Sequence, residues 1–415
     1  MLRLKNMKVS LRHLRHFSIY LGFDFLNRGI AFLLLPLFAH SLMPQEYGIY
    51  ALFLTVTTLL IPFMDLTLNN AIPRVYVTPT LDFSKYISTN IFFSLAMCAL
   101  LSVGALFLKP LFLKEALSFL AVAPLVTLSN LWMGLLSWVL RVEERPVTFG
   151  LVNLYSVVLQ CVLSIGALVW LHVGWRGLIA VQVIVAGLRG ALILWVLIGN
   201  GWLIFSFDKA SLKFGLRWGM GFLFTSLAYQ MDGAMGRFFL ADGFDMGAVG
   251  LYAMGEKIGS LVSIYLNALA NVYQPWLYRG LAQKVQPWRK IFLVTVSIFA
   301  SLIIFAWGGS LMVYLLREPL LGERFQGAVI YIWFCATAAA VRGMYWITAL
   351  FISYTLRTWL ISIVTASAAA LNFLGMWVFI RTSGVLGVAY APLFAWLLAV
   401  LCLLYIARSL WRGRI

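Results

Sequence analysis

Twelve long apolar segments dominate this sequence. At 1.5 Å per residue, a helix of about 20 residues spans the ~30 Å hydrocarbon core of a membrane. Most of the segments are apolar all round, which is typical of membrane spans and not of helices in a soluble protein. The sequence therefore predicts an all-α polytopic membrane protein with about 12 transmembrane helices. The segments are 17–42, 49–68, 86–108, 116–139, 148–171, 177–198, 218–240, 248–270, 291–315, 327–352, 359–380 and 386–407.

The overall composition supports a membrane protein. Hydrophobic residues make up 63% of the chain and charged residues 11%, against roughly 45–50% and 25% in soluble domains. A net charge of +17 would suggest nucleic acid in a soluble chain, but here membrane topology explains it and we expect no nucleic-acid partner. The four cysteines lie in apolar segments without metal-ligand spacing, so we expect neither a metal site nor a cofactor.

The distribution of basic residues predicts the orientation. Short connections such as 43–46 make consecutive helices antiparallel, so an even number of spans leaves both termini on one side. The loops and tails on that side carry 20 Lys and Arg, and the opposite loops carry 6. The positive-inside rule therefore places both termini in the cytoplasm. The basic start of the chain resembles a signal peptide, but the first apolar segment is too long and contains charges, so we expect an uncleaved first span.

A weak internal repeat relates the two halves at an offset of 202 residues. Residues 46–51 align with 248–253, and the register continues without a gap. The identical pairs include Gly48/Gly250, Tyr50/Tyr252, Ala51/Ala253, Asn69/Asn271, Pro73/Pro275 and Tyr76/Tyr278. Such self-similarity indicates a duplicated unit. We expect two six-helix halves of the same orientation, related by a pseudo-twofold axis around a central cavity, as in alternating-access carriers.

The expected domains follow from the spans and the repeat. Between the halves, aromatic and basic residues interleave, which favours an amphipathic linker lying on the membrane surface. The predicted divisions are a basic cytoplasmic segment 1–16, an N-terminal half 17–198, an amphipathic cytoplasmic linker 199–217, a C-terminal half 218–407 and a basic cytoplasmic tail 408–415.

Ionisable residues inside the predicted spans are the candidate functional groups, because such residues are costly in a bilayer and often line a pathway. Asp24 and Arg28 share one helical face, and they could form either a locking pair or part of a transport site. Asp232 and Arg237 are five apart, a poor spacing for a pair. The intramembrane acids are Asp24, Asp65, Asp232 and Glu256, and the bases are Arg28, Arg189, Arg237, Lys257 and Arg342.

The excess of bases favours a cationic central cavity that accepts an anion. Arg189 and Arg342 have no acidic residue within four positions, and guanidinium groups bind phosphate bidentately. The alternative for either arginine is that it reaches the membrane interface or caps backbone carbonyls. The sequence contains no phosphate-binding loop, zinc-protease motif or nucleophile elbow and has no soluble domain, so we do not expect an enzyme.

Short motifs recur along both halves of the chain. They lie at 33–37, 42–50, 65–66 and 71–76 in the first half, and at 232–237, 250–252, 371–372 and 384–389 in the second. These motifs resemble those of polysaccharide flippases of the O-antigen translocase type, members of the multidrug/oligosaccharidyl-lipid/polysaccharide exporter superfamily. The resemblance covers nearly the whole chain.

The resemblance implies a carrier that moves an undecaprenyl-diphosphate-linked oligosaccharide between leaflets of the bacterial inner membrane. Its partners would be this substrate, membrane lipids and other polysaccharide-assembly membrane proteins. By this analogy the five bases contact diphosphate or sugar acids, with Arg28 and Arg342 the foremost. The four acids are candidates for coupling to a proton or sodium gradient.

Two other functions compete with this hypothesis. A multidrug/cation antiporter of the same superfamily would be expected to have an acidic cavity, whereas bases outnumber acids here. A membrane-embedded polysaccharide polymerase or glycosyltransferase would need a large extracytoplasmic loop, and the longest such loop, 316–326, is short. A scaffold would leave the repeat and the buried charges without a role.

Overall fold

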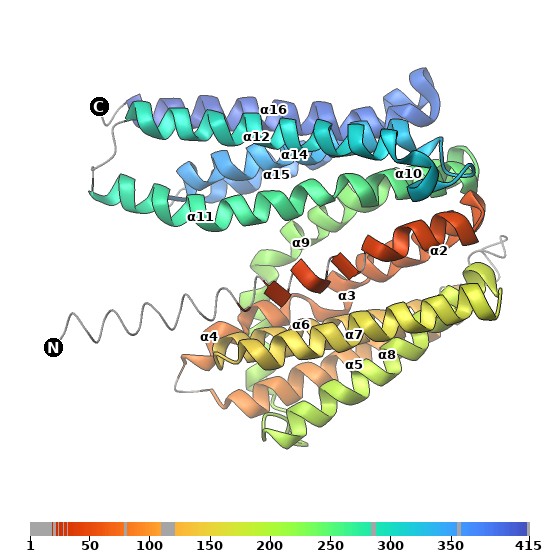
Figure 1. Ribbon diagram of the computed structural model, residues 1–415. Coiled ribbons are helices and arrows are strands. Elements are labelled where there is room, and N and C mark those ends of the chain that lie inside the picture. Colours follow the sequence, from red (N-terminus) through yellow and green to blue (C-terminus); the bar gives the residue numbers. More distant parts are fainter. Residues whose placement is uncertain are drawn as a thin grey trace. The chain divides into compact units, whose positions relative to one another are not determined.

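The computed structural model describes residues 19, 22–23, 25–27, 29–30, 32–78, 81–108, 121–283, 288–354 and 358–412. These residues are almost entirely helical, and none of them forms a strand (Figure 1). The α-helices are α2 Pro44–Leu59, α3 Ile61–Asp65, α4 Ile72–Tyr76, α5 Phe83–Leu108, α6 Ala123–Val142, α7 Pro146–Ile165, α8 Gly174–Gly199, α9 Lys209–Gly243, α10 Met246–Gly259, α11 Leu261–Gln283, α12 Trp288–Leu315, α13 Arg317–Leu321, α14 Ala328–Tyr354, α15 Thr358–Ser383 and α16 Gly387–Arg412. The predicted all-α fold is confirmed.

Eight helical stretches in the described part of the chain are long and apolar enough to cross a membrane. One of them, Trp359–Ser409, contains both α15 and α16 and so accounts for two predicted spans. The seventh predicted span lies in the charged helix α9, and the eighth is interrupted at Ser260, between α10 and α11. The first lies in Phe25–Ser41, which includes residues outside the described set.

The chain divides into two compact units. Unit 1 comprises Met1–Leu42 and Leu52–Leu227, and unit 2 comprises Met43–Ala51 and Ala228–Ile415. Two helices are therefore shared, because α2 begins in unit 2 and ends in unit 1, whereas α9 begins in unit 1 and ends in unit 2. The predicted halves meet instead at the linker 199–217, so the packing units and the repeat halves differ at these two helices.

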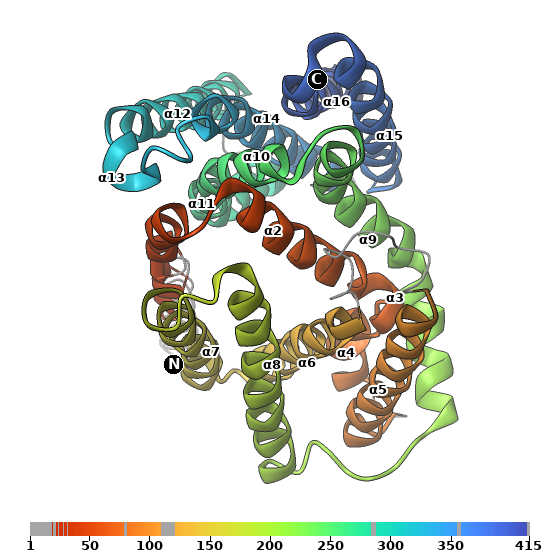
Figure 2. The same ribbon diagram turned by 90° about the vertical axis from the view of Figure 1, so that its right-hand side faces the viewer.

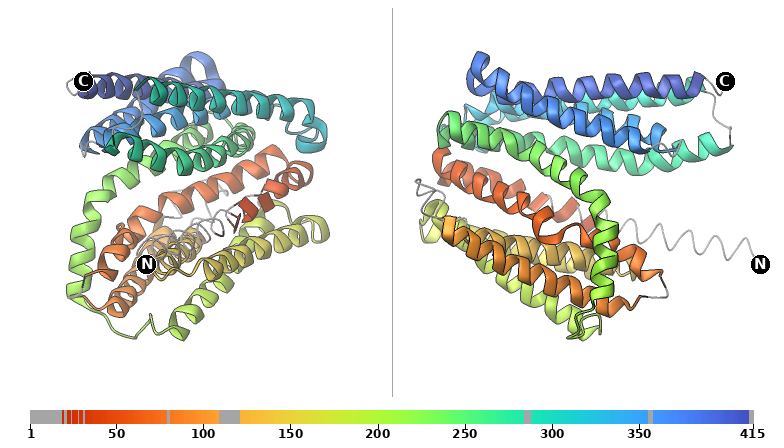
Figure 3. Two further views of the ribbon diagram at one scale, coloured as in Figure 1. Left: turned by 60° about the vertical axis from the view of Figure 1, so that its left-hand side comes forward. Right: turned by 180° about the vertical axis from the view of Figure 1, so that it is seen from behind.

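Within each unit, one helix is surrounded by the others. In unit 1 the helix α6 packs against α3, α4, α5, α7 and α8, and its buried face includes Leu135, Leu136 and Val139. In unit 2 the helix α14 packs against α10, α11, α12, α15 and α16. Figure 2 shows the helices of unit 1 nearly end-on, and Figure 3 shows α12, α14 and α16 of unit 2 running alongside one another. Within each bundle, buried apolar side chains form the surfaces along which the helices pack.

The start of α2 belongs to unit 2 because two repeat-related glycines let it approach α10 very closely. A Cβ atom on Gly48 would lie 2.0 Å from the backbone oxygen of Met246, and one on Gly250 would lie 1.9 Å from that of Pro44. The two contacts are reciprocal, since Pro44 and Met246 are also 202 residues apart. Small residues that bring helix backbones together are a common device in membranes. The repeat thus places one glycine on each side of this crossing.

The segment after α2 in unit 1 is broken by two residues with left-handed backbone. Leu66 has φ 42° and Thr67 has φ 60°, a conformation that costs roughly 1–2 kcal/mol for a residue with a side chain. The Thr67 hydroxyl donates a hydrogen bond to the backbone oxygen of Gly219 in α9. A side chain at Gly219 would collide with the Leu66 oxygen, 2.6 Å from its Cβ position. The break is therefore held by contacts with α9.

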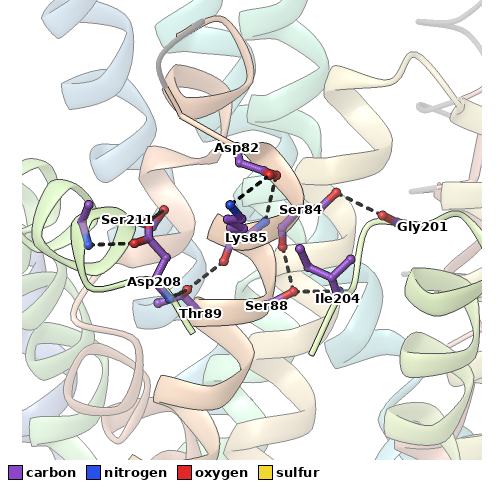
Figure 4. Close-up of polar contacts among 10 residues, drawn as sticks. Asp82, Ser84, Lys85, Ser88, Thr89, Gly201, Ile204, Asp208 and Ser211 are labelled. Atoms are coloured by element: carbon purple, nitrogen blue, oxygen red, sulfur yellow. Dashed lines mark hydrogen bonds and ion pairs between the residues drawn. The ribbon is translucent and has the colours of Figure 1, made fainter. Parts of the chain in front are cut away.

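The segment before α9 is fastened to the start of α5 by backbone and hydroxyl groups (Figure 4). Ser84 donates to the Gly201 oxygen at 3.0 Å, and the backbone N–H of Asp208 donates to Thr89 Oγ1 at 2.9 Å. The Asp208 carboxylate accepts from the backbone and hydroxyl of Ser211 and so caps α9. These bonds, chiefly those from Ser211, lower the pKa of the Asp208 carboxyl. Phe205, by contrast, is 85% exposed.

Candidate functional site

Unit 2 contains a polar cavity between its helices. Its volume is about 100 Å³, which has room for several water molecules. The residues that line it come from α9, α10, α11, α14 and α16, and three of them are charged: Asp232 on α9, Glu256 on α10 and Arg342 on α14. Ser260 and Ser263, at the junction of α10 and α11, add hydroxyl groups. This cavity gathers charges from helices far apart in the sequence.

Arg342 and Asp232 form an ion pair at this cavity. The distance from Arg342 Nη2 to Asp232 Oδ2 is 2.5 Å, and Asn372 Nδ2 donates to the other carboxylate oxygen at 2.6 Å. The Asp232 side chain is 2% exposed, whereas that of Arg342 is 30% exposed. The Arg342 guanidinium also lies 4.8 Å from the centre of the Trp396 ring, within cation–π range. The carboxylate is thus enclosed, and the guanidinium is the more accessible member of the pair.

A second ion pair joins Arg237 of α9 to Glu256 of α10. Glu256 Oε2 accepts from Arg237 Nη2 at 2.8 Å and from Nε at 3.2 Å. Arg237 Nη1 also donates to the backbone oxygen of Ala51, in the part of α2 that belongs to unit 2. The spacing of Asp232 and Arg237 in the sequence is poor for a pair, and in the structure each has another partner. Five residues turn a helix by about 140° beyond a full turn, so each points to a different neighbouring helix.

Lys257, next to Glu256 in the chain, does not join this cavity. Its side chain is exposed and is absent from the lining residues. Adjacent positions on a helix point in different directions, so the structure separates these two predicted site residues.

The polar groups of unit 1 are arranged differently. Arg189 on α8 donates from Nε to Ser129 Oγ at 2.8 Å and from Nη2 to Asn130 Oδ1 at 2.6 Å. Both partners are neutral and lie on α6, and no acidic side chain in the described part of unit 1 forms an ion pair with Arg189. A larger cavity of about 410 Å³ between α6 and α8 has a mainly apolar lining that includes Ser129.

Asp65 caps the helix break of unit 1. Its carboxylate accepts from the backbone N–H of Asn69, with both oxygens at 3.3 Å. The Asn69 side chain donates to the Leu131 oxygen and accepts from Asn90 Nδ2. Asp65, a predicted site residue, therefore lies in a buried network of amide groups. It forms no ion pair with any of the described residues.

The remaining two predicted site residues, Asp24 and Arg28, lie outside the described residues. Among those that are described, no group of three or more His, Cys, Asp or Glu side chains could hold a metal ion. Sequence reasoning did not select Asn372 and Trp396 as site residues, although both touch the Asp232–Arg342 pair. Asn372 is a polar residue within an apolar span, and this was the signal by which the sequence could have identified it. An aromatic residue in such a span carries none.

Long apolar helices packed in two bundles define a multi-pass membrane protein. The sequence profile described as "Polysaccharide biosynthesis protein" matches residues 13–281. Since that is well over half of the chain, this protein belongs to the polysaccharide biosynthesis protein family, as the motifs indicated.

Similar proteins agree with this assignment. Lsg locus protein 1 of Haemophilus influenzae is 22% identical over 320 residues, which cover 74% of this chain and 77% of the relative. An inward-facing multidrug resistance MATE transporter of the MOP superfamily has a TM-score of 0.70 at 15% identity, covering 95% of this chain and 97% of that one. The lipid II flippase MurJ in an inward closed conformation has a TM-score of 0.72 at 12% identity, covering 94% and 87%. The chain shares the fold of these two proteins.

Proposed function

We propose that this protein is a flippase that translocates undecaprenyl-diphosphate-linked oligosaccharide units across the bacterial inner membrane for the synthesis of O-antigen or another surface polysaccharide. The observation that carries the proposal is the charged cavity of unit 2, with Arg342 at its wall, in a membrane protein of a polysaccharide biosynthesis family. The MOP fold supports alternating access as the mechanism.

A polar cavity reduces the main energetic barrier to such transport. Moving a diphosphate and its sugars through hydrocarbon costs on the order of tens of kcal/mol in the Born limit. A hydrated cavity with a fixed guanidinium lowers this cost for the head group, while the polyprenyl tail stays in lipid. Guanidinium forks also match phosphate oxygens in geometry.

The structure supports different roles for the predicted site residues. We assign Arg342 to the substrate head group and Arg189 to a separate contact in unit 1, where its described partners are neutral. Arg237 is paired with Glu256, and its role as a substrate contact stays a prediction from the sequence. Asp232 and Glu256 line the cavity and are the proposed groups for coupling to a proton or sodium gradient. Arg28 and Lys257 as substrate contacts, and Asp24 and Asp65 as coupling groups, remain predictions from the sequence.

The proposed orientation places both termini in the cytoplasm, as the distribution of basic residues predicts. The proposed partners are the lipid-linked oligosaccharide, membrane lipids and other membrane proteins of polysaccharide assembly. The exposed Phe205 beside Lys209 fits a linker that lies on an anionic membrane surface.

The first test is the leaflet distribution of lipid-linked oligosaccharide in cells that lack the gene, measured with probes that cannot cross the membrane. We expect the intermediate to accumulate in the cytoplasmic leaflet and surface polymer to disappear from gels. Normal distribution and normal polymer would refute the proposed function.

Complementation of that strain then tests the basic residues. Arg28→Ala and Arg342→Ala should each impair transport at least tenfold while the protein still inserts, because a lost charge-assisted contact costs roughly 1.5–3 kcal/mol. Membrane levels on immunoblots control for insertion. Full activity of both variants would rule out the cationic site.

The second candidate function is a multidrug/cation antiporter, which the similarity of fold to a MATE transporter favours. Asp232 and Glu256 would then bind the cation. Dye and drug efflux in the same deletion strain separates the two candidates, because a flippase mutant should retain normal efflux.

A further inference from the structure

Arg342 holds a special position among the residues around the unit 2 cavity. It is the one base among the described lining residues, where it stands with two acids, Asp232 and Glu256. Glu256 is already paired with Arg237 through two hydrogen bonds to one oxygen. An anion that binds in this cavity would therefore compete with Asp232 for Arg342.

The burial of the pair is unequal in a way that suits such a competition. Asp232 is 2% exposed and Arg342 is 30% exposed, so the guanidinium is the more accessible member of the pair, and both residues line the cavity. Asn372 holds the carboxylate in place through the oxygen that Arg342 does not use. A guanidinium has five N–H donors, and the bond to Asp232 is made by Nη2.

Trp396 provides a surface on which the guanidinium can turn. Its ring centre lies 4.8 Å from Arg342 Cζ, and a cation–π contact does not use up the N–H donors of the guanidinium. Rotation on the ring would keep the cation–π contact while the edge moves from one anion to another.

We propose that Arg342 exchanges between Asp232 and a phosphate group of the cargo, so that Asp232 is a built-in counter-ion that occupies the guanidinium while the cavity is empty. The described partners of Arg189 are neutral, whereas Arg342 is paired with a buried carboxylate, and breaking such a pair is unfavourable unless another anion replaces it. This inference rests on the proposed function and assigns to the cargo a phosphate that displaces a carboxylate.

The exchange also links cargo to a cation. When Arg342 turns to the phosphate, Asp232 is left as a buried carboxylate whose remaining hydrogen bond is to Asn372, and it then takes up a proton or a monovalent cation. The charged and titratable groups around Asp232 are Arg237 on its own helix, Tyr252 and Glu256 on α10, and Cys335 and Arg342 on α14. Since Arg237 and Glu256 neutralise each other, Arg342 is the counter-ion whose departure matters.

The test is binding of farnesyl diphosphate, with farnesol and inorganic pyrophosphate as comparison ligands, to the full-length protein in nanodiscs. Asp232→Asn is isosteric and removes the competing carboxylate, so we expect the dissociation constant for farnesyl diphosphate to fall about tenfold. Arg342→Gln should weaken binding at least tenfold, and the double variant should bind like Arg342→Gln. Equal or weaker binding by Asp232→Asn would overturn the proposal.

Glu256→Gln is the matched control, because it removes the same charge from the same cavity but from the other pair. Equal tightening by Glu256→Gln would show a general charge effect and would also overturn the exchange. If Asp232→Asn does not fold, the fluorescence of Trp396 gives a second measurement. This signal is the difference between the tryptophan fluorescence of the wild type and that of Trp396→Phe. It should change with farnesyl diphosphate and not with farnesol, and no change would contradict the movement of Arg342.

The cation step has its own readout. In the wild type, farnesyl diphosphate should bind more tightly either as the pH falls from 8 to 5.5 or as Na⁺ is added at constant ionic strength, and the responding condition identifies the cation. Asp232→Asn should lose this dependence. A wild type indifferent to both would refute the linkage.

These results also separate the inference from the proposed function. Cytoplasmic accumulation of lipid-linked oligosaccharide in the deletion strain, without tightening by Asp232→Asn, would refute the exchange alone. Tightening by Asp232→Asn with a normal leaflet distribution would refute the oligosaccharide cargo and retain the phosphate site.

Discussion

The second helices of the two repeats have polar residues at equivalent positions, but these residues are buried in the first repeat and exposed in the second. In the first repeat, Asp65 is 6% exposed and Asn69 is 8% exposed, and both join a hydrogen-bonded amide network. Their equivalents at the offset of 202, Asn267 and Asn271, are exposed. The duplication therefore preserved polar positions whose environments then diverged.

The charged positions, by contrast, are not shared between the two repeats. Glu256 of the second repeat lines a cavity and pairs with Arg237, whereas its equivalent in the first repeat is Leu54. The backbones differ as well, since the first repeat is broken at Leu66 and Thr67 and the second continues as α11. Shared glycines at the crossing and unshared charges indicate that the scaffold is common to both repeats and the chemistry belongs to one.

The largest effect is expected at the shared crossing. Gly48→Ala and Gly250→Ala each place a Cβ about 2 Å from a backbone oxygen that cannot rotate away, so each should lower the free energy of unfolding by about 3 kcal/mol or more. Thermal melts of the purified protein measure this. Gly308→Ala, where nothing lies within 4 Å, is the control and should be neutral or stabilising. If Gly48→Ala left the stability unchanged while Gly250→Ala reduced it, the two glycines would not be equivalent.

The charge pair of the second repeat comes next. Glu256→Gln leaves Arg237 without its carboxylate, and because the pair is partly exposed we expect a loss of about 2 kcal/mol, less than for a fully buried pair. The double variant Arg237→Leu/Glu256→Leu introduces the residues found 202 positions earlier, Leu35 and Leu54. It should recover most of the stability and none of the transport. Recovered transport would show that the pair is structural.

The buried amide network of the first repeat gives a smaller effect. Asn69→Leu removes the donor to the Leu131 oxygen and the acceptor for Asn90, which should cost about 1–2 kcal/mol. Asn271→Leu, the same change at the exposed equivalent, should stay within about 0.5 kcal/mol. Similar melting temperatures for the two variants would contradict the difference in burial.

The smallest effect concerns the start of α9. Hydrogen bonds from Ser211 lower the pKa of the Asp208 carboxyl in the folded protein, so the contribution of its charge is present above the unfolded pKa of about 3.9 and is lost as the pH falls through the folded pKa. Asp208→Asn should therefore melt slightly below the wild type at pH 7, and the two curves should converge as the pH approaches 3. A difference that stays constant with pH would exclude this origin.

Much of the fold follows from local sequence patterns. Apolar length predicted the helices, and the repeat identified Gly48 and Gly250 as equivalent before their reciprocal contact was visible. The break at Leu66 and Thr67 had no such signal, because neither residue favours left-handed backbone. It depends on Gly219, more than 150 positions away, whose missing side chain leaves room for the Leu66 oxygen.

The sequence by itself determined that the chain is a helical membrane protein with two related halves, and which ionisable residues lie within its spans, because membrane thickness and helical rise make these properties local. Only the tertiary structure decided which charges are partners. Asp232 meets Arg342 across 110 positions and Asn372 across 140, while the nearby Arg237 turns to Glu256. Helix packing sets these distances, and spacing along one helix carries no information about which neighbour its side chains will face.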